Sequence, residues 1–99
     1  MSTAQAAAVT GPGRSRAIRR LKVLEGQIRG LQQMLDEGRY CVDVLVQIAA
    51  AQEALRGVSK LVMRYFLENC ATAAIRSGDP EENAAMYDEL MDVVFKYVK

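Results

Sequence analysis

The stretch "CVDVLVQIAAAQEALRGVSKLVMRYFLENCATAAIR", residues 41–76, decides the fold of this 99-residue chain. Apolar side chains lie almost all round its helical projection, and Gly57 is the one weak interruption, tolerated in a helix at a modest cost. The stretch therefore predicts a single long helix that needs packing partners on several sides. Near its middle, small residues allow two helix backbones to approach closely: Ala50, Ala51, Ala54 and Gly57.

A shorter amphipathic helix is predicted on each side of this long helix. Before it, apolar residues spaced three and four apart predict a helix over residues 16–36, with Ser15 as its N-cap and Gly38 ending it. After it, "SGDPEE" places Gly78 at a helix end and Asp79 at the N-cap of a helix over residues 80–97. Glu82 stands three residues after Asp79, the spacing of a capping box.

The expected fold class is therefore all-α, with three helices per chain. Residues 1–15 are expected to form a disordered tail, and residues 16–99 a single helical domain. A chain that is 51% hydrophobic and this small suits assembly. Its apolar runs are far shorter than the roughly 20 residues that cross a bilayer. The N-terminus does not read as a signal peptide, so we expect a cytoplasmic protein with reduced thiols.

The net charge of +1 hides an asymmetry along the chain. Residues 1–40 carry seven Lys/Arg and three acids, whereas residues 77–99 carry two Lys/Arg and six acids. The basic end suits an anionic partner such as nucleic acid. The alternative is that these charges are the solvated faces of ordinary helices.

The chain has two cysteines, Cys41 and Cys70, and no histidine. In a continuous helix they are separated by roughly 43 Å, at about 1.5 Å per residue. An antiparallel pair of long helices from two subunits places Cys41 of one chain opposite Cys70 of the other. Cys41 begins a helix, where the helix dipole stabilises a thiolate, so it is the expected nucleophile and Cys70 the resolving thiol. The alternative is that both are small buried core residues.

The segment "RLKVLEGQIRGLQQMLDEGRYCVDVLVQI" and the later "LENC" resemble the copper-sensing operon repressor (CsoR) family of bacterial transcriptional repressors. The likeness covers about residues 16–98. It implies antiparallel dimers that form a four-helix bundle and pair into tetramers. It also implies binding to double-stranded operator DNA, from which an inducer at the intersubunit site releases the protein.

The resemblance also bears on the inducer. Copper-sensing members place a histidine four residues before the second cysteine, and this chain has Phe66 there. The closest likeness is therefore to the persulfide-responsive branch, the CsoR-like sulfurtransferase repressors (CstR), which need no histidine and no metal cofactor. Cu(I) held by Cys41 and Cys70 alone is the alternative within the same class. Tyr40 and Glu89 match the family's residues beside the site.

Several basic and polar residues are candidates for contacts with DNA. Arg20 and Gln27 are implied by the resemblance, and the others are inferred from their side of a helix: Arg16, Arg19, Arg29, Arg56 and Lys60. Most are expected to contact phosphates. A thiol-based sulfur or copper carrier without DNA binding is the alternative of another class, and a plain helical assembly module is a third. Without histidine or a strand-based phosphate loop, no enzyme is expected.

Overall fold

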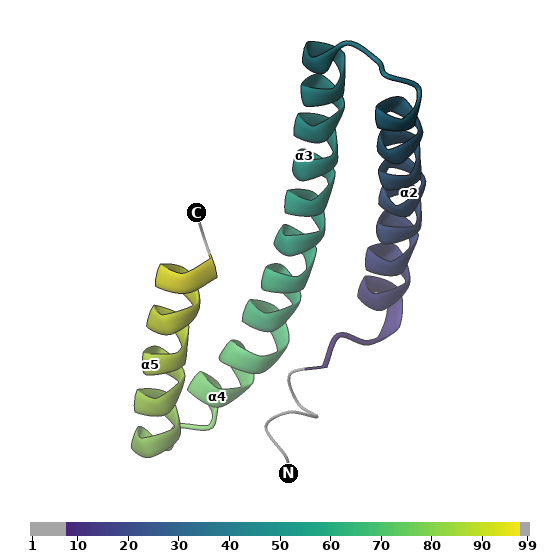
Figure 1. The fold of residues 1–99 in the computed structure, drawn as a ribbon. Helices are drawn as coiled ribbons and strands as arrows, with labels where there is room; N and C mark the ends of the chain where they lie inside the picture. The colour runs from purple at the N-terminus through teal and green to yellow at the C-terminus, as the bar shows by residue number, and fades with distance from the viewer. Residues whose placement is uncertain (1–7, 98–99) are drawn as a thin grey trace. The chain divides into compact units, whose positions relative to one another are not determined.

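The computed structural model describes residues 8–97, and these residues are almost entirely helical (Figure 1). The elements are α2 (Gly11–Asp36), α3 (Cys41–Tyr65), the π-helix η1 (Phe66–Ala71), α4 (Thr72–Arg76) and α5 (Pro80–Tyr97). No strand occurs in this part of the chain, which confirms the all-α prediction. The predicted long helix is helical from residue 41 to residue 76, but a π-helical segment divides it.

The chain divides into two compact units. We call Val9–Met63 the hairpin unit, and the residues from Arg64 onward the C-terminal unit. Every helix within residues 8–97 is too short or too polar to span a bilayer.

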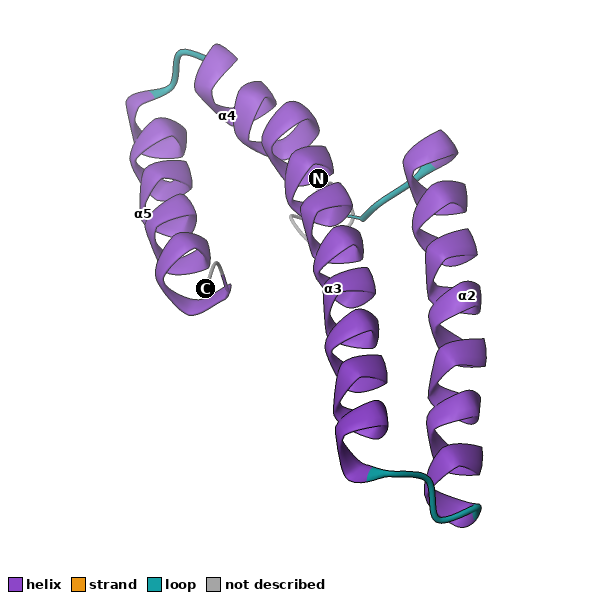
Figure 2. Ribbon diagram, turned by 90° about the horizontal axis from the view of Figure 1, so that it is seen from above, coloured by secondary structure: helices purple, strands orange, loops and turns teal. Residues whose placement is uncertain are grey.

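In the hairpin unit, α2 and α3 lie side by side in opposite directions (Figures 1 and 2). The reversal between them depends on Gly38, whose φ of 69° is readily adopted only by glycine. Its N–H donates to the Leu35 carbonyl at 3.2 Å, and the Arg39 N–H donates to the Met34 carbonyl at 3.0 Å. These bonds satisfy carbonyls at the end of α2, so the prediction that Gly38 ends this helix is confirmed.

The start of α2 differs from the prediction. The helix begins at Gly11 and not near Arg16, so Ser15 lies inside it and is not its N-cap. Pro12 occupies the first turn, where its fixed φ suits a helix and its missing N–H needs no partner. Residues 11–15, assigned to the tail from sequence, are therefore helical, while residues 1–7 of that predicted tail lie outside the described residues.

The core of the hairpin unit is a narrow seam of small and medium side chains. Its buried members repeat every seven residues, at Ala17 and Leu24 on α2 and at Val44, Ala51 and Val58 on α3. A seven-residue spacing keeps one face of each helix toward its neighbour. Larger apolar side chains on both helices stay exposed in the single chain: Ile18, Leu21, Ile28, Leu35, Leu45, Ile48, Leu55 and Val62.

In the C-terminal unit, α4 and α5 are joined by a short turn at Gly78, whose φ is 72°. The Asp79 side chain accepts a hydrogen bond from the Glu81 N–H at 3.0 Å, so Asp79 is the N-cap as predicted. The Asp79 N–H donates to the Ser77 hydroxyl at 3.3 Å and not to Glu82, so the predicted capping box is wrong.

Candidate sensor site and nucleic-acid interface

Cys41 is the first residue of α3 and is exposed. The preceding residue, Tyr40, accepts the first hydrogen bond of the helix on its carbonyl, from the Val44 N–H at 3.2 Å. The Tyr40 side chain is itself 68% exposed. The thiol of Cys41 thus stands at a helix N-terminus within reach of a reagent in solution.

Cys70 has a different environment, inside η1, where it is half-buried. Burial raises the pKa of the Cys70 thiol, and the negative charge of Glu89 raises that pKa further. Glu89 belongs to α5, so the C-terminal unit brings together two residues that the sequence analysis had singled out separately. The expectation that Cys70 is a poorly acidic thiol agrees with this surrounding.

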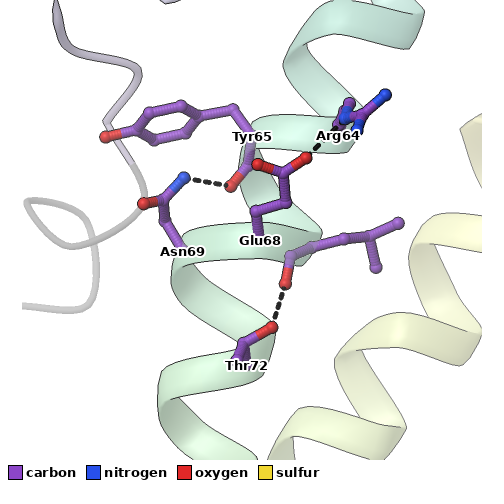
Figure 3. Close-up of polar contacts among 6 residues, drawn as sticks. Arg64, Tyr65, Glu68, Asn69 and Thr72 are labelled. Atoms are coloured by element: carbon purple, nitrogen blue, oxygen red, sulfur yellow. Dashed lines mark hydrogen bonds and ion pairs between the residues drawn. The ribbon is translucent and has the colours of Figure 1, made fainter.

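The π-helix that carries Cys70 was missed from the sequence. Its first residue is Phe66, which is also half-buried. Figure 3 shows the polar side chains in and beside this segment: Asn69 donates to the Tyr65 carbonyl at 3.0 Å, and the Thr72 hydroxyl donates to the Leu67 carbonyl at 2.8 Å. The Thr72 N–H also donates to that carbonyl, across five residues.

These side chains donate to backbone carbonyls at the place where the chain changes from α-helix to π-helix. Just before them, Arg64 and Glu68 form an exposed ion pair. The sequence signal was weak, since Asn69 and Thr72 are the only sign that polar side chains bond to the backbone within an apolar helix. Short π-helical segments occur often at functional sites, and this one contains both Phe66 and Cys70.

The donors available for a metal ion are few. Residues 8–97 contain no group of three or more His, Cys, Asp or Glu side chains placed to hold one. The chain has no histidine anywhere. Two thiolates therefore fit a two-coordinate Cu(I) ion, whereas a site with two sulfurs and one imidazole does not fit these residues. The pairing of Cys41 with Cys70 across subunits remains a prediction.

The predicted DNA-contacting residues fall into two groups. Arg29 pairs with Glu25 at 3.1 Å and Arg56 pairs with Glu53 at 3.2 Å, each within its own helix and each exposed. Such surface pairs contribute at most about 1 kcal/mol, so a phosphate can compete with them. Within residues 8–97, the other basic candidates form no ion pair: Arg16, Arg19, Arg20 and Lys60.

Helical periodicity arranges the candidates of α2 around its axis. At about 100° per residue, Arg16, Arg19, Arg20 and Gln27 share one side of the helix. Arg29 lies about half a turn away from Arg20, on the opposite flank of the apolar stripe. The first four residues are therefore the more coherent set for a single DNA surface.

Arg20 is the candidate that contacts the neighbouring helix. It lines a shallow hollow between α2 and α3, together with Val23, Glu53, Ala54 and Gly57. A Cβ atom built on Gly57 would stand 3.1 Å from Arg20 Nη1. Gly57, which the sequence suggested as a site of close helix packing, thus faces an arginine of its own chain.

Comparison with known proteins gives consistent matches. Residues 13–96 match the family described as "Metal-sensitive transcriptional repressor". The chain is 45% identical over 80 residues to the copper-sensing transcriptional repressor CsoR of Bacillus subtilis, covering 81% of this chain and 76% of that protein. It is 44% identical over 62 residues to the copper-sensing transcriptional repressor RicR of Mycobacterium tuberculosis, covering 63% of this chain and 65% of that one.

A solved structure agrees with these matches. The crystal structure of the copper-sensing repressor CsoR with Cu(I) from Geobacillus thermodenitrificans has a TM-score of 0.81 and 39% identity, and the match covers 93% of each chain. The resemblance seen in the residues around Cys41 is thus confirmed at the level of the family, whose members are transcriptional repressors and not enzymes. The chain belongs to the family of metal-sensitive transcriptional repressors that includes CsoR.

Proposed function

We propose that this repressor binds operator DNA as a tetramer and is released when an inducer acts on Cys41 of one subunit and Cys70 of another. The observation that carries the proposal is the contrast between the two thiols. Cys41 is exposed at a helix N-terminus, whereas Cys70 is half-buried beside Glu89. Membership in a repressor family favours operator binding over a thiol carrier without DNA.

Assembly is supported by the apolar surface of the single chain. Leu45 is 61% exposed and Leu55 is 50% exposed on α3, and Leu35 is 66% exposed on α2. Each fully buried side chain of this kind contributes about 1.5–3 kcal/mol. An antiparallel pair of subunits covers these side chains in a four-helix bundle, and two such dimers make the tetramer.

The DNA surface is proposed on α2, with Arg16, Arg19, Arg20 and Gln27 as its centre and Lys60 of α3 beside it. These basic residues form no ion pair among residues 8–97, so their charges are available to phosphates. Arg29 and Arg56 are proposed as outer contacts that exchange an acidic partner for a phosphate.

For the inducer we propose a persulfide, because the chain has no histidine and Phe66 stands where copper sensors place one. The Cys41 thiolate attacks the outer sulfur of an organic persulfide, giving a Cys41 persulfide and an organic thiol. The Cys70 thiol then attacks the Cys41 sulfur, forming an intersubunit disulfide and releasing hydrogen sulfide. No further oxidant is needed, because the incoming sulfur atom is reduced as the two thiols are oxidised.

Cu(I) is the second candidate, and the relatives favour it. The Bacillus and Mycobacterium proteins are copper-sensing repressors, and the Geobacillus protein was crystallised with Cu(I). In this chain Cys41 and Cys70 would supply two soft thiolates to the ion, with no imidazole. With either inducer, three further residues would lie beside the two thiols without reacting or binding the metal: Tyr40, Phe66 and Glu89.

One experiment separates the two inducers. A fluorescent DNA duplex, selected from a random library by the reduced protein, is bound and then titrated with an organic persulfide or with Cu(I) under anaerobic conditions. Release by persulfide at one equivalent, with added sulfur or a bridge at Cys41 by mass spectrometry, supports the first proposal. Release by Cu(I) alone supports the second. Failure to select any duplex contradicts operator binding itself.

A further inference from the structure

Gly57 stands in the interior of α3, where a glycine has no conformational purpose. Among the described glycines, positive φ values occur at Gly11, Gly38 and Gly78, so the backbone of Gly57 is one that any residue adopts. A glycine inside a helix lowers its stability by about 0.5–1 kcal/mol relative to alanine. The surroundings of Gly57 offer a reason for a glycine at this position.

The surrounding atom is the guanidinium nitrogen Nη1 of Arg20, which would lie 3.1 Å from a Cβ on Gly57. Ordinary contact between such atoms is about 3.5–4.0 Å, so a Cβ at residue 57 requires the Arg20 guanidinium to move by a few tenths of an ångström. Gly26 and Gly30 on α2 differ from Gly57, because a Cβ on either would have no neighbour within 4 Å. Among these three helical glycines, only Gly57 makes room for a charged group.

The hollow is also lined by Glu53, whose carboxylate forms no ion pair with Arg20. That carboxylate pairs with Arg56 on its own helix at 3.2 Å. Arg20 forms no ion pair among residues 8–97. The end of the Arg20 side chain therefore lies near Gly57 of α3, and no carboxylate of the described residues pairs with its guanidinium, which can still donate to a phosphate or a base edge.

We propose that Gly57 is a positioning residue for operator recognition: the missing side chain lets the Arg20 guanidinium lie against α3 and sets its direction toward DNA. The inference rests on the proposed function, because it takes Arg20 as a DNA contact. Held against a helix, the arginine has less conformational freedom to lose on binding than it would have extended into solvent.

The test is a double-mutant cycle with Gly57→Ala and Arg20→Ala, measured on the duplex selected by the wild-type protein. Gly57→Ala is expected to weaken binding about tenfold, the equivalent of about 1.4 kcal/mol. If one phosphate contact is lost per site, the slope of log affinity against log salt falls by about 0.9 for that site. Helix stability is expected to stay equal or rise, because alanine is the better helix former.

In the Arg20→Ala background, Gly57→Ala is expected to have no effect on DNA affinity. Ser59→Ala, at an exposed position on α3, is the matched control and is expected to bind like the wild type. Light scattering of each variant checks that the assembly is unchanged. An equal loss in both backgrounds, or a Gly57→Ala variant that binds normally while Arg20→Ala binds weakly, overturns the inference but leaves operator binding in place. Normal binding by Arg20→Ala removes Arg20 from the DNA surface and overturns both assignments.

Discussion

The two cysteines lie in one uninterrupted run of helical residues, yet their surroundings differ. Cys41 opens a regular α-helix in the hairpin unit and is exposed. Cys70 lies in a π-helical segment of the C-terminal unit, half-buried and beside the carboxylate of Glu89. The first environment suits a thiol that meets the inducer, and the second suits one that stays protonated until a partner arrives.

This contrast is what the proposed persulfide response requires of two cysteines without a histidine. In that proposal Cys41 is the attacking thiol and Cys70 the resolving thiol, and neither an imidazole base nor a metal ligand takes part. The asymmetry comes from ordinary sources: exposure at a helix N-terminus for Cys41, and burial plus one negative charge for Cys70.

The largest expected effect comes from removing the exposed thiol. Cys41→Ala is expected to abolish release from DNA by persulfide while leaving operator affinity unchanged, because the nucleophile is lost but the basic face is not. Cys70→Ala is expected to keep a persulfide on Cys41 without forming a bridge. Fluorescence anisotropy with the labelled duplex and mass spectrometry of the peptides measure both outcomes. A Cys41→Ala variant that still responds would reverse the assigned roles.

Phe66→His converts the surroundings of Cys70 toward those of copper sensors. The new histidine would supply a third ligand to Cu(I). We expect it to raise the Cu(I) affinity at least tenfold, which corresponds to about 1.4 kcal/mol of binding free energy. Competition with a chromophoric Cu(I) chelator measures the affinity, and X-ray absorption counts nitrogen ligands. Phe66→Leu, which keeps the residue apolar, is the control. Nitrogen bound to Cu(I) in the wild-type protein would be incompatible with the two-thiolate site.

Glu89→Gln tests whether the negative charge of Glu89 contributes to the raised pKa of Cys70. Removing this negative charge is expected to lower the pKa of Cys70, though burial still keeps it above the ordinary thiol value. The pH profile of Cys70 alkylation, followed by peptide mass spectrometry, should therefore move to lower pH. Asp88→Asn, its exposed neighbour on α5, is the control that should leave the profile in place.

The same raised pKa has a consequence for folding. The protonated Cys70 thiol is favoured in the folded chain, so its contribution to stability is present below the ordinary thiol pKa and is lost as the pH rises through the raised value. Glu89→Gln should reduce this loss in alkaline urea titrations. An unchanged dependence on pH would mean that Glu89 does not act on Cys70.

The smallest expected effect concerns the π-helical segment. Thr72→Val removes the 2.8 Å hydrogen bond from the Thr72 hydroxyl to the Leu67 carbonyl but keeps the side-chain shape. Stability is expected to fall by about 0.5–1.5 kcal/mol, and the alkylation rate of Cys70 to change while that of Cys41 does not. Thr72→Ser keeps the hydroxyl and should behave like the wild type. Equal changes at both cysteines would indicate general loosening of the fold.

The helices and their ends were largely predictable because they depend on local chemistry. Two helix ends depend on the positive φ of a glycine, at Gly38 and Gly78, and the start of α5 depends on the side chain of Asp79. Each of these features involves only residues that are neighbours in the sequence. The start of α2 at Gly11 differs from the predicted start because proline is common both in tails and in the first turn of a helix, and residue type alone does not separate the two. The π-helical segment was missed because no apolar period distinguishes it from an α-helix.

The candidate site was predictable only in part. Cys41 and Cys70 were singled out as the two cysteines of a chain without histidine, and Glu89 through the resemblance. The influence of Glu89 on Cys70 depends on how α5 packs, which the sequence pattern does not specify. The closeness of Arg20 and Gly57 involves two helices, so the pattern of neither helix alone predicts it. Pairing between subunits lies beyond what a single chain contains.

Complementary cysteine variants test directly whether Cys41 of one subunit pairs with Cys70 of another. Cys41→Ala carrying heavy isotopes is mixed with unlabelled Cys70→Ala, subunits are exchanged, and an organic persulfide is added. Each mixed dimer retains one complete pair, with Cys41 from one chain and Cys70 from the other. Pairing between subunits predicts a covalent heterodimer on non-reducing gels, with light Cys41 peptide bridged to heavy Cys70 peptide, and no covalent dimer from either variant alone. Absence of that heterodimer, or a Cys41–Cys70 bridge within one wild-type chain, would contradict it.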